Sequence, residues 1–203
     1  MLLDICSYAV KEALKQKASD AEAYASLDKE TEVFIENNDL KQVKSHKTGS
    51  IGIRIFVNNS LGFASVNSLE KDKVLDAIGK AIKIAKVSPR DKHNRLPAKD
   101  SVKMLKGIYD NNAEGFEPAD ATKRAIEMLK TAKSYDNRVS VDSGTFNSSI
   151  LSHALCNSNG IELEEMLSVF SWNIMGMAID GSDVSNFDFQ FNGTHSEIGR
   201  AHV

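Results

Sequence analysis

The segment of residues 48–68 constrains the fold more than any other, because two β-rich runs flank a pair of asparagines. In the first run, residues 51–57, every second residue is a branched aliphatic side chain. A period of two is typical of a strand with one buried face. The run stops at Asn58-Asn59, and asparagine tolerates the positive φ that a two-residue turn requires. The segment therefore predicts a β-hairpin.

A helix and another hairpin are expected before this segment. Apolar residues recur at helical spacing over residues 3–14, which predicts a first helix. The spacing then changes to period two. We expect a strand over residues 21–36, a turn at Asn37-Asn38, and a return strand over residues 40–45.

Two further helices are expected around a polar connector. Ser68 can cap a helix whose apolar stripe covers residues 74–85. Residues 91–116 are polar and lack strong periodicity, which predicts a connector. Pro118 lies where the first turn of the next helix would be, and that helix should reach about Tyr135.

A second β region follows. Residues 139–156 are expected to form strands broken near residues 147–149, with a turn at residues 157–160 that contains Asn-Gly. The last expected strands cover residues 161–174 and 176–180, with the FDFQF sequence after them.

This order of elements predicts an α+β fold with mainly antiparallel sheets built from hairpins and helices packed on one side. A parallel doubly wound fold is the less favoured alternative. The order also indicates one domain over residues 1–193 made of two similar halves, residues 1–90 and 117–193, joined by the connector of residues 91–116. Residues 194–203 would be the truncated start of a C-terminal domain, or a tail.

Composition excludes several classes of protein. With 25 Lys and Arg against 28 Asp and Glu, the net charge is -3, and no segment concentrates basic residues, so nucleic acid is not an expected direct partner. No run of about 18 apolar residues is present, so no membrane partner is expected. Cys6 and Cys156 are read as reduced core thiols, and the N-terminal segment does not resemble a signal peptide. These features predict a cytoplasmic location.

The histidines do not form a recognisable catalytic or metal site. His46, His93 and His153 have no Cys, Asp or Glu at ligand spacing. His195 and His202 are seven residues apart, which on a helix separates them by roughly 10 Å, too far to share one zinc ion. The nucleophile elbow G-x-S-x-G is also absent. No catalytic, cofactor-binding or metal-binding residue is therefore predicted in this chain.

Aromatic and thioether side chains gather in the last β segments and allow two interpretations. Their alternation favours a core face, and the alternative is a hydrophobic surface that docks the missing catalytic half or a partner subunit. In the first interpretation Asn186, Asp188 and Gln190 face the other way, toward solvent. The apolar residues concerned are Phe170, Trp172, Met175, Met177, Phe187, Phe189 and Phe191.

Several short motifs together resemble the N-terminal half of the TldD/PmbA family of zinc metallopeptidases. They are the hairpin pattern of residues 48–68, Tyr109-Asp110, the D-x-R-V of residues 136–139, and the CNSNG turn of residues 156–160. The resemblance implies a zinc site of the form H-E-x-x-x-H in the C-terminal half, outside this chain. This sequence has no H-E pair, so no zinc ligand is carried over to it.

The resemblance implies two functions. One is the substrate-cleft-forming part of a metallopeptidase that acts on unfolded peptides. The other is a non-catalytic PmbA-like binding subunit that pairs with an active relative. The expected partners are therefore a peptide and a same-family subunit, as homodimer or heterodimer.

Thr194 and Glu197 have capping-box spacing, and a helix is expected to begin near His195. That helix would stop at the end of the chain, which favours either an N-terminal fragment or an altered tail over the final GRAHV residues.

Overall fold

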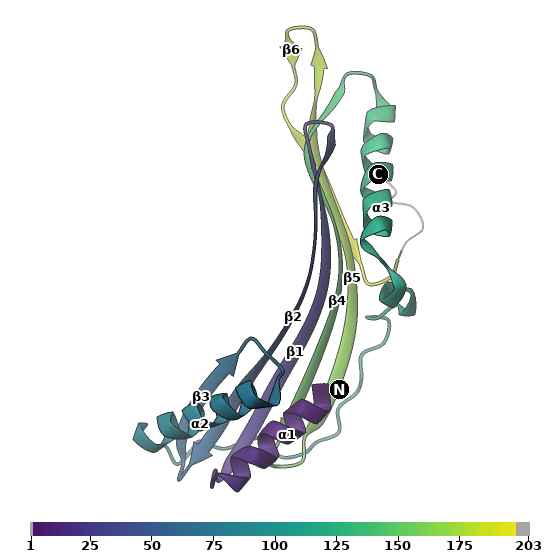
Figure 1. The fold of residues 1–203 in the computed structure, drawn as a ribbon. Coiled ribbons are helices and arrows are strands. Elements are labelled where there is room, and N and C mark those ends of the chain that lie inside the picture. Colours follow the sequence, from purple (N-terminus) through teal and green to yellow (C-terminus); the bar gives the residue numbers. More distant parts are fainter. Residues whose placement is uncertain (1, 198–203) are drawn as a thin grey trace. The chain divides into compact units, whose positions relative to one another are not determined.

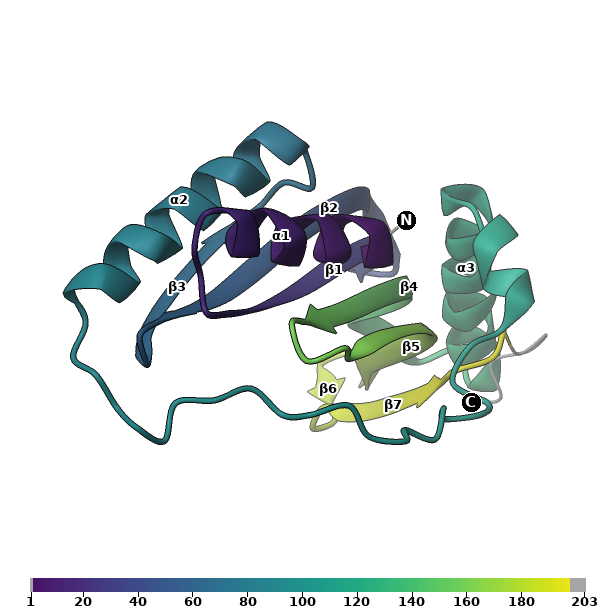
Figure 2. The same cartoon turned by 90° about the horizontal axis from the view of Figure 1, so that it is seen from below.

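The computed structural model describes residues 2–197 of the chain. Figure 1 shows its helices and strands, and Figure 2 shows the same elements after a rotation of 90°. In chain order the elements are α1 (Leu2–Lys15), β1 (Asp20–Glu36), β2 (Asp39–Val57), β3 (Ser60–Val66), α2 (Lys71–Val87), the 3-10 helix η1 (Asn111–Gly115), α3 (Pro118–Tyr135), β4 (Val139–Asn157), β5 (Glu162–Asp180), β6 (Asp183–Val184) and β7 (Asp188–Thr194).

The strands form one sheet in the order β3-β2-β1-β4-β5-β6, and β7 also pairs with β5. The pairings of β2 with β3, of β5 with β6 and of β5 with β7 are antiparallel. This confirms the predicted α+β class. On each side of the connector, a helix is followed by two long strands and a short strand that pairs with the second of them. The order agrees with the expected similarity of the halves, which stays a prediction.

Contacts divide the chain into two compact units, and the four long strands contribute residues to both. Unit 1 consists of Met1–Asp28, Lys47–Met104 and Leu151–Met166. Its core joins the aliphatic face of β2 to the apolar stripes of α1 and α2, which lie over the same face of the sheet (Figure 2). Small side chains such as Ala9 and Ala81 are fully buried where helices meet strands. This packing follows from the helical spacing of apolar residues in α1 and α2 and from their alternation in β2.

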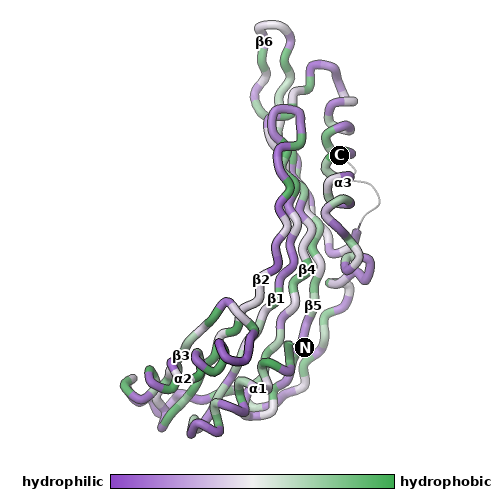
Figure 3. Tube along the Cα trace, in the orientation of Figure 1, coloured by the Kyte–Doolittle hydropathy of each residue, from purple (hydrophilic) through white to green (hydrophobic). Residues whose placement is uncertain are grey.

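Unit 2 consists of Lys29–His46, Leu105–Ile150 and Leu167–Val203. Here α3 packs its apolar stripe, including Met128, onto aromatic and branched residues such as Phe146 and Trp172. The tube in Figure 3 alternates between hydrophilic and hydrophobic colours along α3, as expected for a helix with one buried side. Glu117 and Asp120 form a capping box at its start, and Pro118 is the first helical residue, as predicted.

Both asparagine turns are confirmed. Asn37 and Asn38 have φ values of 52° and 67°, and Asn58 and Asn59 have 51° and 63°. Two successive residues with positive φ are the signature of the tight hairpin turn whose twist matches that of its strands. The sequence therefore located both hairpins correctly.

Three expected interruptions are wrong. β2 continues through residues 46–50, so three strands lie between α1 and α2 where four were expected. β4 continues through residues 147–149, and β5 through residue 175. Polar or small side chains suggested loops at the first two of these points, but a strand tolerates them where its side chains are only partly covered. The N-cap of α2 also differs from the prediction, because Glu70 and not Ser68 occupies that position. The Ser68 hydroxyl instead accepts a hydrogen bond from the backbone N–H of Glu70 at 3.2 Å.

The helix expected near His195 does not begin there. Thr194 ends β7, its hydroxyl accepts a hydrogen bond from the backbone N–H of Ser196 at 3.2 Å, and residues 195–197 are not helical. The rest of that prediction falls on residues 198–203, outside the described residues. Among the helices within residues 2–197, none is long and apolar enough to cross a membrane.

Candidate functional site

The pleat of β7 determines which of its side chains face α3. Gln190 is paired with Ile174 and Asn192 with Trp172, and both β5 residues are buried in the core that contains α3. Directly paired residues in a sheet project from the same face. The polar side chains of β7 therefore face the helix side, while Phe189 and its neighbours project from the opposite face.

The phenylalanine row is consequently exposed, and the prediction that it forms a core face is wrong. Phe187, Phe189 and Phe191 are 57%, 61% and 73% exposed. Their alternation showed correctly that Phe189 and Phe191 share a face, and their rings stack with centroids 6.1 Å apart. Alternation does not reveal which face a helix covers, and here α3 covers the other one. The same prediction is confirmed for Phe170 and Trp172, which are buried.

Two neighbouring cavities lie between α3 and strands β5 and β7, and we name them together the α3–β7 groove. The larger cavity, of about 390 Å³, lies between the end of α3 and residues 185–190. The smaller, of about 240 Å³, lies beside Asn192. Apolar residues such as Val141 and Ile174 form the floor, and β7 supplies polar walls. The full set of lining residues is Arg124, Thr131, Ala132, Tyr135, Val139, Val141, Phe146, Phe170, Trp172, Ile174, Gly176, Met177, Ala178, Ser185, Asn186, Asp188, Phe189, Gln190, Asn192, Gly193, Thr194 and Glu197.

Charged groups gather at the end of the groove beside Glu197. Arg124 Nη2 lies 2.6 Å from Glu197 Oε1, and its Nη1 lies 3.1 Å from Glu127 Oε2. These carboxylates raise the pKa of Arg124, and the hydrogen bond that Arg124 donates to Glu197 is the largest cause. The Glu197 backbone N–H donates to Asp110 Oδ2 at 2.8 Å. Backbone N–H groups of Asn112 and Glu197 hold the pKa of Asp110 below its ordinary value, so the residues after β7 are anchored electrostatically.

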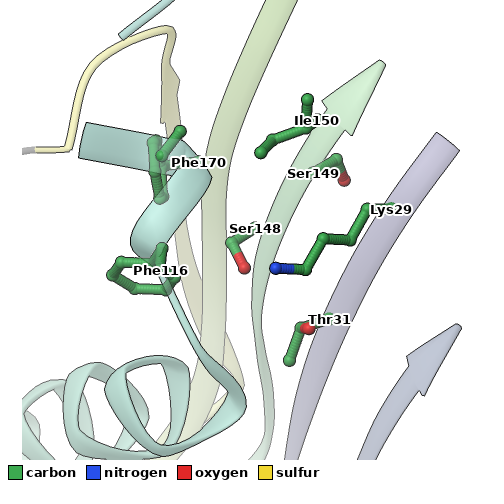
Figure 4. A pocket seen from close by; sticks show the side chains of 8 residues that line it. Lys29, Thr31, Phe116, Ser148, Ser149, Ile150 and Phe170 are labelled. Carbon is green, nitrogen blue, oxygen red and sulfur yellow. The ribbon is translucent and has the colours of Figure 1, made fainter. Parts of the chain in front are cut away.

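Two other cavities are less suited to a large ligand. The one in Figure 4 has a volume of about 10 Å³, with Lys29 and Ser148 on its wall, which is room for one water molecule. A cavity of about 250 Å³ in unit 1 is lined by Tyr24 and His153. Their rings are stacked, and Tyr24 Oη lies 2.9 Å from His153 Nδ1, so these polar groups already have partners.

Two of the histidines considered in the sequence analysis contact polar groups near them. His46 Nε2 lies 3.2 Å from Glu30 Oε2, and His195 Nδ1 lies 2.7 Å from the carbonyl oxygen of Ser168. His202 lies outside the described residues. Within residues 2–197, no three His, Cys, Asp or Glu side chains gather closely enough to hold a metal ion.

The two cysteines are buried in unit 1 as free thiols, which confirms their interpretation as small core residues. Burial raises the pKa of Cys6 to about 12, and the neighbouring Cys156 adds to this effect. Burial is also the main cause that raises the pKa of Cys156. A thiol held neutral in this way is a poor nucleophile and metal ligand.

The α3–β7 groove was not predicted from the sequence. One signal for it was present, because Asp188, Gln190 and Asn192 alternate with the phenylalanines. An amphipathic edge strand can present either face to a neighbouring helix, and the choice depends on its register with β5. That register is a long-range property, which local periodicity does not contain.

Comparison with known proteins gives three kinds of match. Residues 21–85 match the family described as PmbA/TldA metallopeptidase domain 1. An uncharacterised protein of Methanocaldococcus jannaschii is 27% identical over 136 residues, which are 66% of this chain and 30% of that protein. The crystal structure of TldE from Thermococcus kodakarensis superimposes with a TM-score of 0.85 at 21% identity, covering 94% of this chain and 43% of that one.

A further crystal structure shares the fold. A proposed modulator of DNA gyrase from Bacteroides thetaiotaomicron has a TM-score of 0.80 at 17% identity, covering 95% of this chain and 45% of that one. The chain thus spans less than half the length of these relatives. The matched hairpins lie where the sequence motifs placed them, and the family match and the fold agree. Residues 21–85 therefore match the first domain of the PmbA/TldA metallopeptidase family, and the chain as a whole shares the fold of these solved structures.

Proposed function

We propose that this chain is the peptide-binding, substrate-cleft-forming part of a TldD/PmbA-type metallopeptidase, and that it holds an unfolded peptide in the α3–β7 groove. The observation that carries the proposal is the larger cavity of about 390 Å³, with an apolar floor and a polar strand as one wall. Most ligand sites combine apolar surface with a few polar groups in this way. Zinc and its activating glutamate would come from a part of the protein outside this chain.

The dimensions of the groove suit an extended chain. β7 has 7 residues and is about 20 Å long at roughly 3.4 Å per residue, so a peptide of about six or seven residues can lie along it. The space between α3 and β7, of about 390 Å³ in its larger cavity, can admit a single extended segment, whereas a folded domain is too large to enter it. The geometry therefore favours unfolded substrates.

The chemistry of the walls favours tolerance of many sequences. Gln190 and Asn192 carry amides that both donate and accept hydrogen bonds, so they can satisfy the backbone of any peptide. Ile174 and Trp172 below them offer apolar surface to side chains. Tyr135, which is 90% exposed, can cover one end of a bound segment at small entropic cost.

A second candidate is a non-catalytic PmbA-like binding subunit that pairs with an active relative. It is favoured by the residues that line the groove, because amides, aromatic rings and an ion-paired arginine suit binding rather than bond cleavage. Both candidates require the same peptide binding by this chain. The presence of H-E-x-x-x-H in the full-length protein would separate them.

The test measures fluorescence anisotropy of dye-labelled unstructured decapeptides titrated with this chain. Binding is expected for linear peptides of unrelated sequence and is expected to weaken at least about tenfold when the same peptide is cyclised. Gln190→Trp, which places an indole in the groove from an exposed strand position, should abolish binding.

Asn173→Trp is the matched control, because Asn173 is exposed on β5 and projects from the opposite face. It should leave peptide affinity within about twofold, a difference of roughly 0.4 kcal/mol. Absence of binding to every linear peptide would contradict the proposal, and so would equal losses in the two tryptophan variants.

A further inference from the structure

The sequence contains two Asn-Gly steps, Asn159-Gly160 in the turn before β5 and Asn192-Gly193 in β7. In such a step the glycine nitrogen can attack the Cγ atom of the asparagine side chain and close a cyclic imide. Glycine favours this reaction, because it has no Cβ atom to restrict the approach of its nitrogen. Local sequence gives both steps the same tendency, so a difference between them must come from the fold.

The direction of backbone hydrogen bonds alternates along β5. The carbonyl of Ala178 accepts a hydrogen bond at 2.9 Å from the N–H of Ser185, which lies between β6 and β7. The N–H of Ile179 points to the other side of β5 and donates to the carbonyl of Arg138, next to β4, at 2.8 Å. Even-numbered residues of β5 therefore bond toward β7.

The N–H of Gly193 consequently lies outside the ladder. Asn192 pairs with Trp172, so its backbone groups face β5 and those of Gly193 face away. The Gly193 N–H donates instead to Oδ1 of the Asn192 side chain at 2.7 Å. A C=O bond is about 1.23 Å long, so the Gly193 nitrogen lies within about 4 Å of the Cγ atom that it would attack. Both residues are exposed, so water reaches them.

The other Asn-Gly step is held by hydrogen bonds that oppose the reaction. The Gly160 N–H donates to the carbonyl of Asn157 at 3.2 Å. The side-chain amide of Asn159 donates to the carbonyls of Leu96 and Pro97 at 3.1 and 3.2 Å. These bonds must break before the Gly160 nitrogen can reach Cγ, so the fold protects this step.

We propose that Asn192 is a site of spontaneous deamidation, at which the folded chain converts an amide of the α3–β7 groove into a carboxylate. The Gly193 nitrogen gives its proton to solvent and bonds to Cγ. The bond from Cγ to Nδ2 then breaks, and the nitrogen leaves as ammonia after taking a proton from solvent. Water opens the imide at either carbonyl, which gives aspartate or isoaspartate, so water is the co-reactant and no oxidant or reductant takes part.

Both products change the smaller cavity of the groove, which Asn192 lines together with Arg124 and Glu197. Aspartate adds a negative charge to a cavity whose arginine is already paired with Glu197 at 2.6 Å. Isoaspartate lengthens the backbone by one carbon atom, which moves the residues after it out of register with β5. Trp172 is the single tryptophan of the chain and pairs directly with Asn192, so its fluorescence reports either change.

The test incubates the purified chain in mildly alkaline buffer at physiological temperature. Mass spectrometry with electron-transfer fragmentation locates the products and separates aspartate from isoaspartate. Asn192 should be converted to both products at least about tenfold faster than Asn159 in the same sample. In urea, where the fold no longer constrains either step, the two rates should agree within about threefold. The emission of Trp172 should change with the time course of conversion at Asn192.

Gly193→Ala is the variant that tests the attacking nitrogen. A Cβ atom there meets its nearest atoms at 3.6 Å, which is ordinary contact, so the fold accommodates it. The variant should slow conversion of Asn192 at least about tenfold and leave that of Asn159 unchanged. Circular dichroism checks that the variant is folded.

Four results would each overturn the proposal. They are an Asn192 that stays intact, conversion of Asn159 as fast as that of Asn192 in the folded chain, aspartate as the single product, and an unaltered rate in Gly193→Ala. Unchanged Trp172 emission in fully converted protein would refute the effect on the groove.

Discussion

Gly62 lies where β3 touches α2, and replacing it with alanine tests the packing of unit 1. A Cβ atom at Gly62 would lie 1.9 Å from the carbonyl oxygen of Ala81 and 2.7 Å from the backbone nitrogen of Ala85. Both atoms belong to the helix backbone, so no side chain can rotate away. To move from 1.9 Å to ordinary contact at 3.4 Å, the helix must retreat by roughly 1.5 Å.

That movement would separate the α2 stripe from β2, since Val74 and Ile78 are fully buried in the same core. Overpacking usually costs about 1–3 kcal/mol, and a clash with backbone belongs at or above the upper end. We therefore expect Gly62→Ala to lower the free energy of unfolding by about 3 kcal/mol or more, measured by urea denaturation followed by circular dichroism.

Gly79→Ala is the matched control in α2, because a Cβ there meets no atom within 4 Å. It should stabilise the protein by about 0.5–1 kcal/mol through helix propensity. A Gly62→Ala variant within about 1 kcal/mol of wild type would refute the packing argument.

Three further predictions concern thiols, a turn and a carboxylate. Burial raises the pKa of Cys6 from 9.0 to about 12. At pH 8 its thiolate fraction is therefore about a thousandfold smaller than that of a free thiol, and its reaction with iodoacetamide should be slower by about the same factor. Equal rates in native and urea-unfolded protein would show that Cys6 is not buried. Asn59→Gly should be neutral or stabilising in thermal unfolding, because φ is 63° there and glycine adopts positive φ at no cost; a loss above about 1 kcal/mol would contradict the turn geometry. The pKa of Asp110 is lower in the folded chain than its ordinary value of 3.8. The hydrogen bond that the Asp110 carboxylate accepts from the Glu197 backbone N–H is therefore present at neutral pH. It is lost as the pH falls below 3.8 toward the lowered pKa of the folded chain. Amide hydrogen exchange at residue 197, corrected for its intrinsic pH dependence, should rise in that window in wild type and already be high at neutral pH in Asp110→Ala; protection unchanged in that variant would refute the anchoring.

The hairpins were predictable because their determinants are local. Asn37-Asn38 and Asn58-Asn59 fix the turns, and alternation fixes the faces of the strands beside them. Helices α1 and α3 were predictable for the same reason, since a stripe of apolar residues and Pro118 are legible without the rest of the chain. The family resemblance rested on these same local motifs.

Strand lengths and the groove depended on interactions between distant residues. Residues 46–50 remain in β2, although their composition resembles a loop. The exposure of Phe191 depends on its pairing with Asn173, which places it on the face that α3 does not cover. No window of local sequence contains that choice. The groove follows from the same pairing, so the sequence supplied its residues but not its position.

Photo-crosslinking is the most direct measurement of the central claim that the α3–β7 groove holds an extended peptide. An unstructured peptide with a central benzophenone would be irradiated with this chain, and the crosslinked residues identified by mass spectrometry. The account predicts crosslinks concentrated at Tyr135, Gln190 and Asn192, and their loss with excess unlabelled peptide. Crosslinks that fall mainly in unit 1, or that persist unchanged under competition, would contradict it.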